Sequence, residues 1–171
     1  MSPTIRKGNV DDARDMAVIA VTAWREAYRD LMPGELLQQS VEKREARFRA
    51  VLTGIDDSER RTWVCEVDGA VVGYVSTGPS RDDPAGQDVA EVYAVYFLPE
   101  HWGAGLAHPL QDHALADLRE RGFAAVTLWV LTTNDRARRF YERAGFALDV
   151  ESVVKELMGF ELPHTRYRLE L

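Results

Sequence analysis

One stretch decides the fold: Pro99-Glu100-His101-Trp102-Gly103-Ala104-Gly105-Leu106-Ala107. It follows an apolar run typical of a strand and precedes an amphipathic pattern typical of a helix. Small residues let the backbone approach an anion closely, and the first turn of a helix offers unpaired N–H groups at the positive end of its dipole. The stretch therefore predicts a loop that binds phosphate.

A second segment, about thirty residues further on, strengthens this prediction. It reads Asn134-Asp135-Arg136-Ala137-Arg138-Arg139-Phe140-Tyr141-Glu142-Arg143-Ala144-Gly145-Phe146. Asn134 is a good helix N-cap and Gly145 a typical residue at a helix end. A Gly-x-Gly pair alone occurs readily by chance, but the two segments together predict one cofactor site.

Composition limits the class of protein and its partners. The chain has 171 residues, which suits a single domain, 1–171, with a sizeable core. Its formal net charge of −7 disfavours nucleic acid as a partner. The single cysteine, Cys65, excludes an intramolecular disulfide and fits a reducing compartment. Because the chain shows neither a signal-peptide pattern nor a long apolar run, we expect a cytoplasmic protein without membrane contact.

Periodicity and turn residues predict a mixed α/β fold in which helices flank a central sheet. The clearest local signal is Asp68-Gly69 between two β-prone runs, which predicts a hairpin. The expected elements, in chain order, are a strand over 4–7, helices over 11–31 and 35–52, strands over 62–67 and 70–76, a loop over 78–88, a strand over 89–98, a helix over 109–121, a strand over 125–131, a helix over 135–144, and strands over 146–157 and 167–171.

With these segments in this order, the chain resembles the GNAT superfamily of acyl-CoA-dependent N-acetyltransferases over nearly its whole length. The resemblance implies a mostly antiparallel sheet with one splayed strand pair, and acetyl-CoA as cosubstrate. The family's pyrophosphate loop reads Gln or Arg, two residues, Gly, one residue, then Gly or Ala. Trp102, Gly105 and Ala107 occupy these positions, and Trp102 departs from the Gln/Arg preference. The amides that the resemblance assigns to the pyrophosphate are those of Gly103, Ala104, Gly105, Leu106, Ala107 and His108.

The same resemblance assigns a role to the strand before the loop. In the family this strand splays from its neighbour, and its freed backbone groups pair with the pantetheine arm of the cofactor like an added strand. The matching residues are Val95, Tyr96 and Phe97. The backbone N–H of Phe97 or its neighbour is expected to meet the oxyanion of the reaction.

The second segment matches the family pattern without an insertion, at Asn134, Ala137, Phe140, Tyr141, Gly145 and Phe146. The resemblance implies that Asn134 contacts the pantetheine arm, with Ala137 and Phe140 beside it. It also implies that Tyr141 lies near the thioester sulfur and donates a proton to the departing thiolate. As a local alternative, Asn134 caps the helix and Tyr141 is an aromatic core residue.

Acetyl transfer to an amine also needs a base, because only the neutral amine is a nucleophile. Glu91 is a single carboxylate within an apolar strand, and period-two alternation predicts a common face with Tyr93, Val95 and Phe97. Its offset from the loop matches the base glutamate of histone-acetylating relatives, whereas the base position of another branch holds Trp129 here. The alternative is that Glu91 is a solvated or ion-paired carboxylate.

Aromatic residues are the candidates for the acceptor pocket. Trp24 and Tyr28 lie on the first helix, where the family lines that pocket, and Tyr93 and Trp129 lie on strands beside the expected cleft. Core packing explains Trp24, Tyr28 and Trp129 as well. The histidines His101, His108 and His113 are spaced by seven and five residues, which does not place them on one helical face, so we expect no metal.

We therefore expect an enzyme that transfers an acetyl group from acetyl-CoA to a primary amine of a small molecule or peptide, by direct attack in a ternary complex. The alternative is a non-catalytic acyl-CoA-binding sensor or interaction module. A nucleotide phosphate site is disfavoured, because no Gly-Lys-Ser/Thr sequence ends the loop. By analogy with the family, the β-rich tail is a possible homodimer surface.

Overall fold

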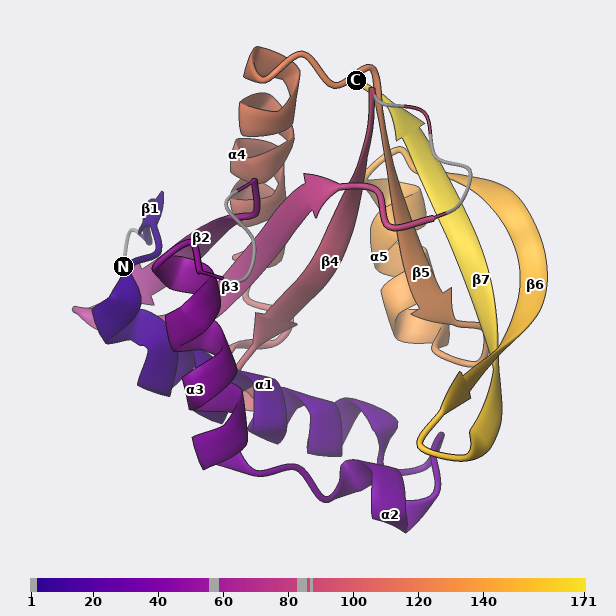
Figure 1. The fold of residues 1–171 in the computed structure, drawn as a ribbon, viewed down its shortest axis with the longest axis horizontal. Coiled ribbons are helices and arrows are strands. Elements are labelled where there is room, and N and C mark those ends of the chain that lie inside the picture. Colours follow the sequence, from indigo (N-terminus) through magenta and orange to yellow (C-terminus); the bar gives the residue numbers. More distant parts are fainter. Residues whose placement is uncertain (1–2, 56–58, 83–85, 87) are drawn as a thin grey trace.

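The computed structural model describes residues 3–55, 59–82, 86 and 88–171. Within these residues, seven strands form one sheet in the order β1-β2-β3-β4-β5-β7-β6 (Figure 1). Neighbouring strands run antiparallel except β4 and β5, which are parallel. The strands are β1 Thr4–Lys7, β2 Arg61–Val67, β3 Ala70–Pro79, β4 Val89–Phe97, β5 Ala125–Leu131, β6 Ala147–Leu157 and β7 Phe160–Glu170.

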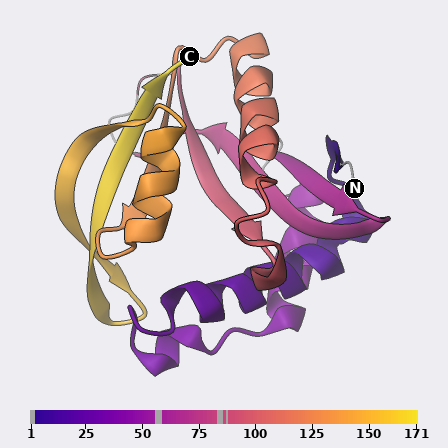
Figure 2. The ribbon, with the colours of Figure 1, turned by 180° about the vertical axis from the view of Figure 1, so that it is seen from behind.

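Helices cover both faces of the sheet, as Figures 1 and 2 show from opposite sides. On one face, Met16 and Ile19 of α1 pack with Phe48 of α3 against the sheet. On the other, Leu110 and Leu118 of α4 lie in a second core. None of the described helices is both long and apolar enough to span a membrane. The helices are α1 Ala13–Tyr28, α2 Gly34–Leu37, α3 Val41–Leu52, α4 Ala107–Glu120 and α5 Asp135–Arg143, with the 3-10 turns η1 Val10–Asp12 and η2 Pro99–His101.

The predicted hairpin is confirmed in β2 and β3. Asp68 and Gly69 both have positive φ, at 52° and 80°, as a two-residue turn that matches the twist of its strands requires. The loop expected over 78–88 is shorter at its start, because β3 extends to Pro79. Positions 83–85 and 87 of that loop lie outside the described residues.

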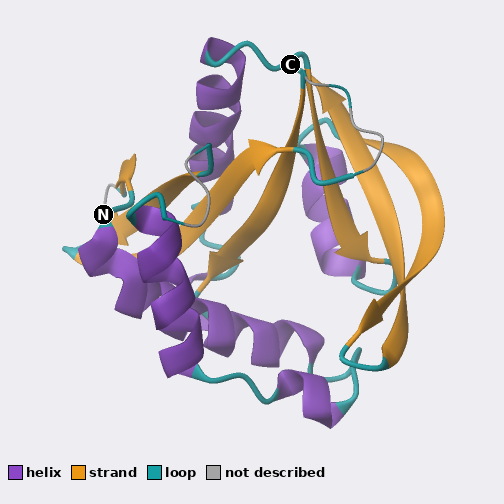
Figure 3. Cartoon of the chain, in the orientation of Figure 1, coloured by secondary structure: helices purple, strands orange, loops and turns teal. Residues whose placement is uncertain are grey.

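The single helix predicted over 35–52 is wrong, because two helices, α2 and α3, occupy this stretch (Figure 3). Gln38 adopts an extended conformation after α2. The Ser40 hydroxyl then accepts a hydrogen bond from the Lys43 amide at 3.2 Å and starts α3. A serine side chain that bonds to the backbone favours the start of a helix over its interior. The spacing of the apolar residues did not reveal this preference.

The last strand is longer than predicted and begins at Phe160 rather than at residue 167. Met158 and Gly159 form a tight turn with φ of 50° and 83°, so the predicted loop through Pro163 does not exist. The Pro163 carbonyl accepts from Thr132 at 2.9 Å, so its nitrogen also faces the β5 side. The β5–β7 ladder ends one residue away, at Leu131↔His164, so no partner strand needs the missing N–H.

The sheet opens in its middle. β4 and β5 share only three pairs, from Val89↔Ala125 to Glu91↔Thr127. Beyond Glu91, β4 continues along β3, while β5 continues along β7. The strands therefore diverge into the splayed pair that the resemblance implied, and β4 has a free edge beyond this point (Figure 1).

Candidate active site

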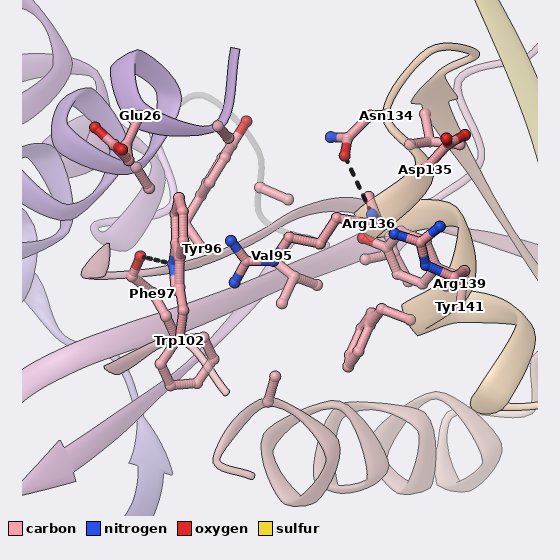
Figure 4. A pocket seen from close by; sticks show the side chains of 18 of the residues that line it. Glu26, Val95, Tyr96, Phe97, Trp102, Asn134, Asp135, Arg136, Arg139 and Tyr141 are labelled. Atoms are coloured by element: carbon pink, nitrogen blue, oxygen red, sulfur yellow. Dashed lines mark hydrogen bonds between the residues drawn. The ribbon is translucent and has the colours of Figure 1, made fainter. Parts of the chain in front are cut away.

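A cavity of about 820 Å³ occupies the opening between β4 and β5. Its walls come from the second half of α1, from β4, from the loop between η2 and α4, from the end of β5, and from α5. Segments that are distant in the sequence thus meet around one space, including the loop of Gly103 and Gly105 and the segment that begins at Asn134. Figure 4 shows this space from close by.

The predicted phosphate loop forms one end of the cavity. Gly103 and Gly105 both have φ of 78°, a backbone conformation that other residues rarely adopt. No side chain caps the N-terminus of α4, which starts at Ala107, two residues before the predicted start. Pro109 is tolerated in this first turn because its missing N–H would have no helical partner. The loop therefore offers unpaired amides and a positive dipole end to an anion.

The free edge of β4 forms a second wall. The Leu98 amide donates to the Val72 carbonyl at 2.9 Å, so every second residue of β4 directs its backbone groups to β3. Tyr96 belongs to that set, whereas the backbone groups of Val95 and Phe97 face the opening. The carbonyl of Phe97 already accepts a hydrogen bond from the Trp102 indole at 2.8 Å. The backbone groups of Val95 and the amide of Phe97 thus face the opening and are available to a bound molecule.

A group of phenols lies inside the cavity. Tyr28 from α1, Tyr96 from β4 and Tyr141 from α5 all line it. Burial raises the pKa of Tyr141 above its ordinary value, and the neighbouring Tyr28 raises it further. Burial also raises the pKa of Tyr28, although hydrogen bonding to Asn134 and Tyr96 opposes this. All three hydroxyls are therefore protonated at neutral pH, and each is a possible proton donor.

Asn134 combines the two roles that its position predicted. Its side-chain oxygen accepts from the Ala137 amide at 3.1 Å and caps α5, while the residue lines the cavity (Figure 4). Ala137 and Phe140 line the cavity too. The Phe140 ring packs between His108 and Tyr141, with ring centroids 4.7 Å and 5.1 Å away. This stacking connects the phosphate loop to the proposed acid.

Glu91 lies on the other face of β4 from the one predicted. The β3–β4 register shifts between Ser76 and Thr77, so Tyr93 is an extra, bulged residue on β4. Val92 consequently packs in the same core as Val95 and Phe97, while Ala94 and Tyr96 pack in the opposite one. Glu91 alternates with Val92 and shares neither the face of Val95 nor that of Phe97. A bulge reverses alternation and leaves no clear trace in the sequence.

Glu91 is buried and paired with a cation. It is 3% exposed, and Arg81 of the loop before β4 binds its carboxylate. The Arg81 guanidinium lies over the Tyr93 ring, with Cζ 4.3 Å from its centroid. Glu91 does not line the cavity, but its neighbours Val92 and Tyr93 do. It lies where β4 leaves β5, at the closed end of the opening.

The four predicted acceptor residues divide into two groups. Tyr28, Tyr93 and Trp129 line the cavity. Trp24 does not; its indole donates to the Leu36 carbonyl at 2.9 Å, and its ring packs against Tyr28 at 4.5 Å between centroids. Trp24 thus holds α1 and α2 together and positions Tyr28.

Three arginines that the sequence reading passed over also line the cavity: Arg136, Arg139 and Arg143 of α5. Their spacing of three and four residues places them on one helical face, which is a signal that the sequence does contain. Together with His101 and His108 they surround the loop with groups suited to phosphates. Among the described residues, no group of three or more His, Cys, Asp or Glu could hold a metal ion.

The residues present fit a coenzyme A molecule. Unpaired amides and cations at the loop suit its phosphates, and the free edge of β4 suits its amide-bearing arm. The half-buried phenol of Tyr141 lines the same cavity. The arrangement is that of a site for transfer of an activated acyl group.

Comparisons with known proteins agree with this arrangement. Residues 20–146 match the Acetyltransferase (GNAT) family. A protein of Archaeoglobus fulgidus named "Uncharacterized N-acetyltransferase" is 32% identical over 140 residues, 80% of this chain and 88% of that protein. The structure of PaiA N-acetyltransferase from Thermoplasma acidophilum in complex with coenzyme A has a TM-score of 0.76 at 18% identity and covers 100% of both chains. That of yncA from Salmonella typhimurium with acetyl-CoA has a TM-score of 0.73 at 21% identity, covering 99% of this chain and 94% of that one.

Fold and site thus define an acyltransferase of mixed α/β architecture. The chain belongs to the GNAT acetyltransferase family and is an acetyl-CoA-dependent N-acetyltransferase. The family, the fold class and the enzyme class predicted from the sequence are confirmed.

Proposed function

We propose that this enzyme transfers the acetyl group of acetyl-CoA directly to a primary amine of a small molecule or peptide while both are bound. Bound acetyl-CoA supplies an activated acetyl group as a thioester. The observation that carries the proposal is Tyr141, a phenol with a raised pKa in the same cavity as the loop of Gly103 and Gly105. PaiA with coenzyme A and yncA with acetyl-CoA share the fold and support the choice of cofactor.

The chain's own groups divide the binding work. The amides of Gly103 and of Gly105 to His108 hold the diphosphate at the start of α4, whereas that of Ala104 donates to the His101 carbonyl at 3.4 Å. Val95 pairs its backbone with the pantetheine arm along β4, and Asn134 contacts the arm from α5. The amide of Phe97 is directed to the opening and is available to stabilise a developing negative charge.

The proton transfers need two groups. Tyr141 donates its phenolic proton to the departing sulfur, because burial keeps the hydroxyl protonated. Glu91 is our candidate for receiving the proton of the acceptor ammonium, relayed by water from the closed end of the opening. Its carboxylate is held by Arg81, so this role requires Arg81 to share or release it. Tyr28, Tyr93 and Trp129 are the proposed walls of the acceptor pocket.

The first experiment is a calorimetric titration of the purified chain with acetyl-CoA, free CoA and ATP. One-site binding of acetyl-CoA and CoA, without binding of ATP, is expected, and amines are then screened by release of CoA. Absence of binding to both CoA forms would overturn the assignment of this cavity.

Sedimentation of the same sample tests the proposed homodimer, for which Leu148 and Val154 of β6 offer exposed apolar surface.

A further inference from the structure

The residue that departs from the family loop has a cationic partner on another element. The guanidinium carbon of Arg136 lies 3.8 Å from the centroid of the Trp102 ring. Arg136 is in the first turn of α5, so its side chain crosses the cavity from that helix towards the loop (Figure 4). Two segments that the opening separates are therefore connected by one stacked pair.

The orientation of this pair is set by the fold. The Trp102 indole N–H donates to the Phe97 carbonyl at 2.8 Å, which fixes the ring plane against the end of β4. Trp102 directly precedes Gly103, the first glycine of the loop with positive φ. Stacking on this ring thus holds the Arg136 guanidinium beside the anion-binding amides.

Arg136 also has its hydrogen-bonding capacity available. Within the described part of the chain, no carboxylate lies within ion-pair distance of it, and its neighbour Asp135 faces Arg138, with N and O 3.9 Å apart. Partial burial lowers the pKa of Arg136, but it stays a cation at neutral pH. A guanidinium held over an aromatic face still presents its N–H groups in its own plane, where a phosphate can accept two of them.

We propose that Arg136, positioned by Trp102, binds the diphosphate of coenzyme A and so replaces from α5 the polar side chain that the loop lacks at position 102. The inference rests on the proposed function and specifies how this chain meets its cofactor. It makes Trp102 a positioning residue and Arg136 the side-chain ligand of the diphosphate.

Calorimetry with three ligands tests the proposal. CoA carries the diphosphate and a 3′-phosphate, 3′-dephospho-CoA keeps only the diphosphate, and pantetheine has neither. We expect R136Q to weaken CoA and 3′-dephospho-CoA equally, by about 10- to 100-fold, as for loss of hydrogen bonds to a charged group, and to leave pantetheine unchanged. The control is R119Q, which removes the same charge from an exposed position of α4 outside the cavity and should leave all three affinities within about threefold.

A swap of the cation between the two elements provides a second test. W102R/R136Q places a guanidinium on the loop and should recover at least about tenfold of the lost affinity for 3′-dephospho-CoA. W102F keeps an aromatic face and should lose less affinity than W102A. Thermal unfolding of each variant shows whether it is folded. If W102A does not fold, the affinities of R136Q still test the proposal, because Arg136 lies at the surface of the cavity.

Contrary results are distinct from failure of the proposed function. A loss with CoA but not with 3′-dephospho-CoA would place Arg136 at the 3′-phosphate and overturn the proposal. An equal loss for pantetheine, or an equal loss in R119Q, would also overturn it. If wild type binds CoA and R136Q binds it as tightly, only this inference falls; if wild type binds no CoA, the proposed function falls with it.

Discussion

Arg81 donates to both carboxylate oxygens of Glu91, from Nε at 3.1 Å and from Nη2 at 2.5 Å, and its own backbone amide adds a bond at 3.0 Å. The residue proposed as base is therefore also the anchor of the loop before β4. As a base, Glu91 has to accept a proton, whereas as an anchor it only has to carry a negative charge that binds Arg81. Separate substitutions of Glu91 and Arg81 distinguish the two roles.

If Glu91 is the base, E91Q should lower kcat by about 100-fold, because no carboxylate then receives the proton of the ammonium. R81Q keeps the carboxylate and should retain kcat within about threefold of wild type. The measurement is release of CoA with the amine found in the screen, from pH 5.5 to 9. Equal losses of kcat in E91Q and R81Q would show that the ion pair, and not the base, matters.

Removal of one oxygen from the proposed acid should stop turnover without affecting binding. We expect Y141F to lower kcat by about 100-fold or more, because the leaving sulfur then lacks its proton donor, and to bind acetyl-CoA as wild type does. Since burial raises the pKa of Tyr141 above its ordinary 10.0, the wild-type rate should show no loss from this group below pH 10. Y74F, at a buried phenol that does not line the cavity, is the matched control. A similar loss of kcat in Y74F would show that Tyr141 has no special role.

The glycine at position 105 should be required for its conformation. Its φ of 78° costs an alanine about 1–2 kcal/mol, so G105A should distort the loop and weaken CoA binding by about tenfold or more. Gly54 has φ of 74° and open space around it, but it lies outside the cavity. G54A should therefore lower the free energy of unfolding by about as much as G105A does, but it should keep the wild-type affinity for CoA. Unchanged CoA affinity in G105A would contradict the assigned amides.

A buried ion pair at the first helix should make stability depend on acid. Asp12 accepts two hydrogen bonds from Arg6, at 2.8 Å and 2.7 Å, and one from the Asn9 amide at 2.7 Å. Burial raises the pKa of Asp12, but these bonds outweigh it and hold the pKa below its ordinary value. A lowered pKa stabilises the fold above pH 4, and this contribution is lost as the pH falls through the folded-state pKa.

D12N should therefore lower the unfolding free energy by about 1–3 kcal/mol at pH 7, measured by urea denaturation. The difference from wild type should shrink as the pH falls through the lowered pKa of Asp12, because the native carboxylate then becomes protonated as well. D11N is the control, since Asp11 is exposed and only its backbone amide is bonded. A D12N deficit that does not shrink anywhere in the acid range where wild type is still folded would assign the effect to shape and not to charge.

Local chemistry in the sequence predicted the parts of the site that depend on backbone conformation. Glycines at 103 and 105, the Asp68-Gly69 turn and the Asn134 cap each require a particular local geometry, and each adopts it. The face of Glu91 could not be predicted in this way. It depends on the bulge at Tyr93, which arises from pairing with a strand elsewhere in the chain.

Contacts between distant elements were likewise outside the reach of local patterns. The extension of β7 through Pro163 depends on where its pairing with β5 ends. The stacking of Arg136 on Trp102 joins residues that the sequence places in separate motifs. In the sequence, Trp102 indicates only that the loop lacks the polar side chain at this position, because its partner Arg136 lies on α5.

The opening between β4 and β5 lies within the sheet and not at its edge. α1 borders it on one face, and α4 and α5 border it on the other (Figure 2). Because the opening is formed where two strands diverge, its walls are fixed by the pairing of β4 with β3 and of β5 with β7. The width of the opening is therefore set by hydrogen bonding within the sheet and not by a loop.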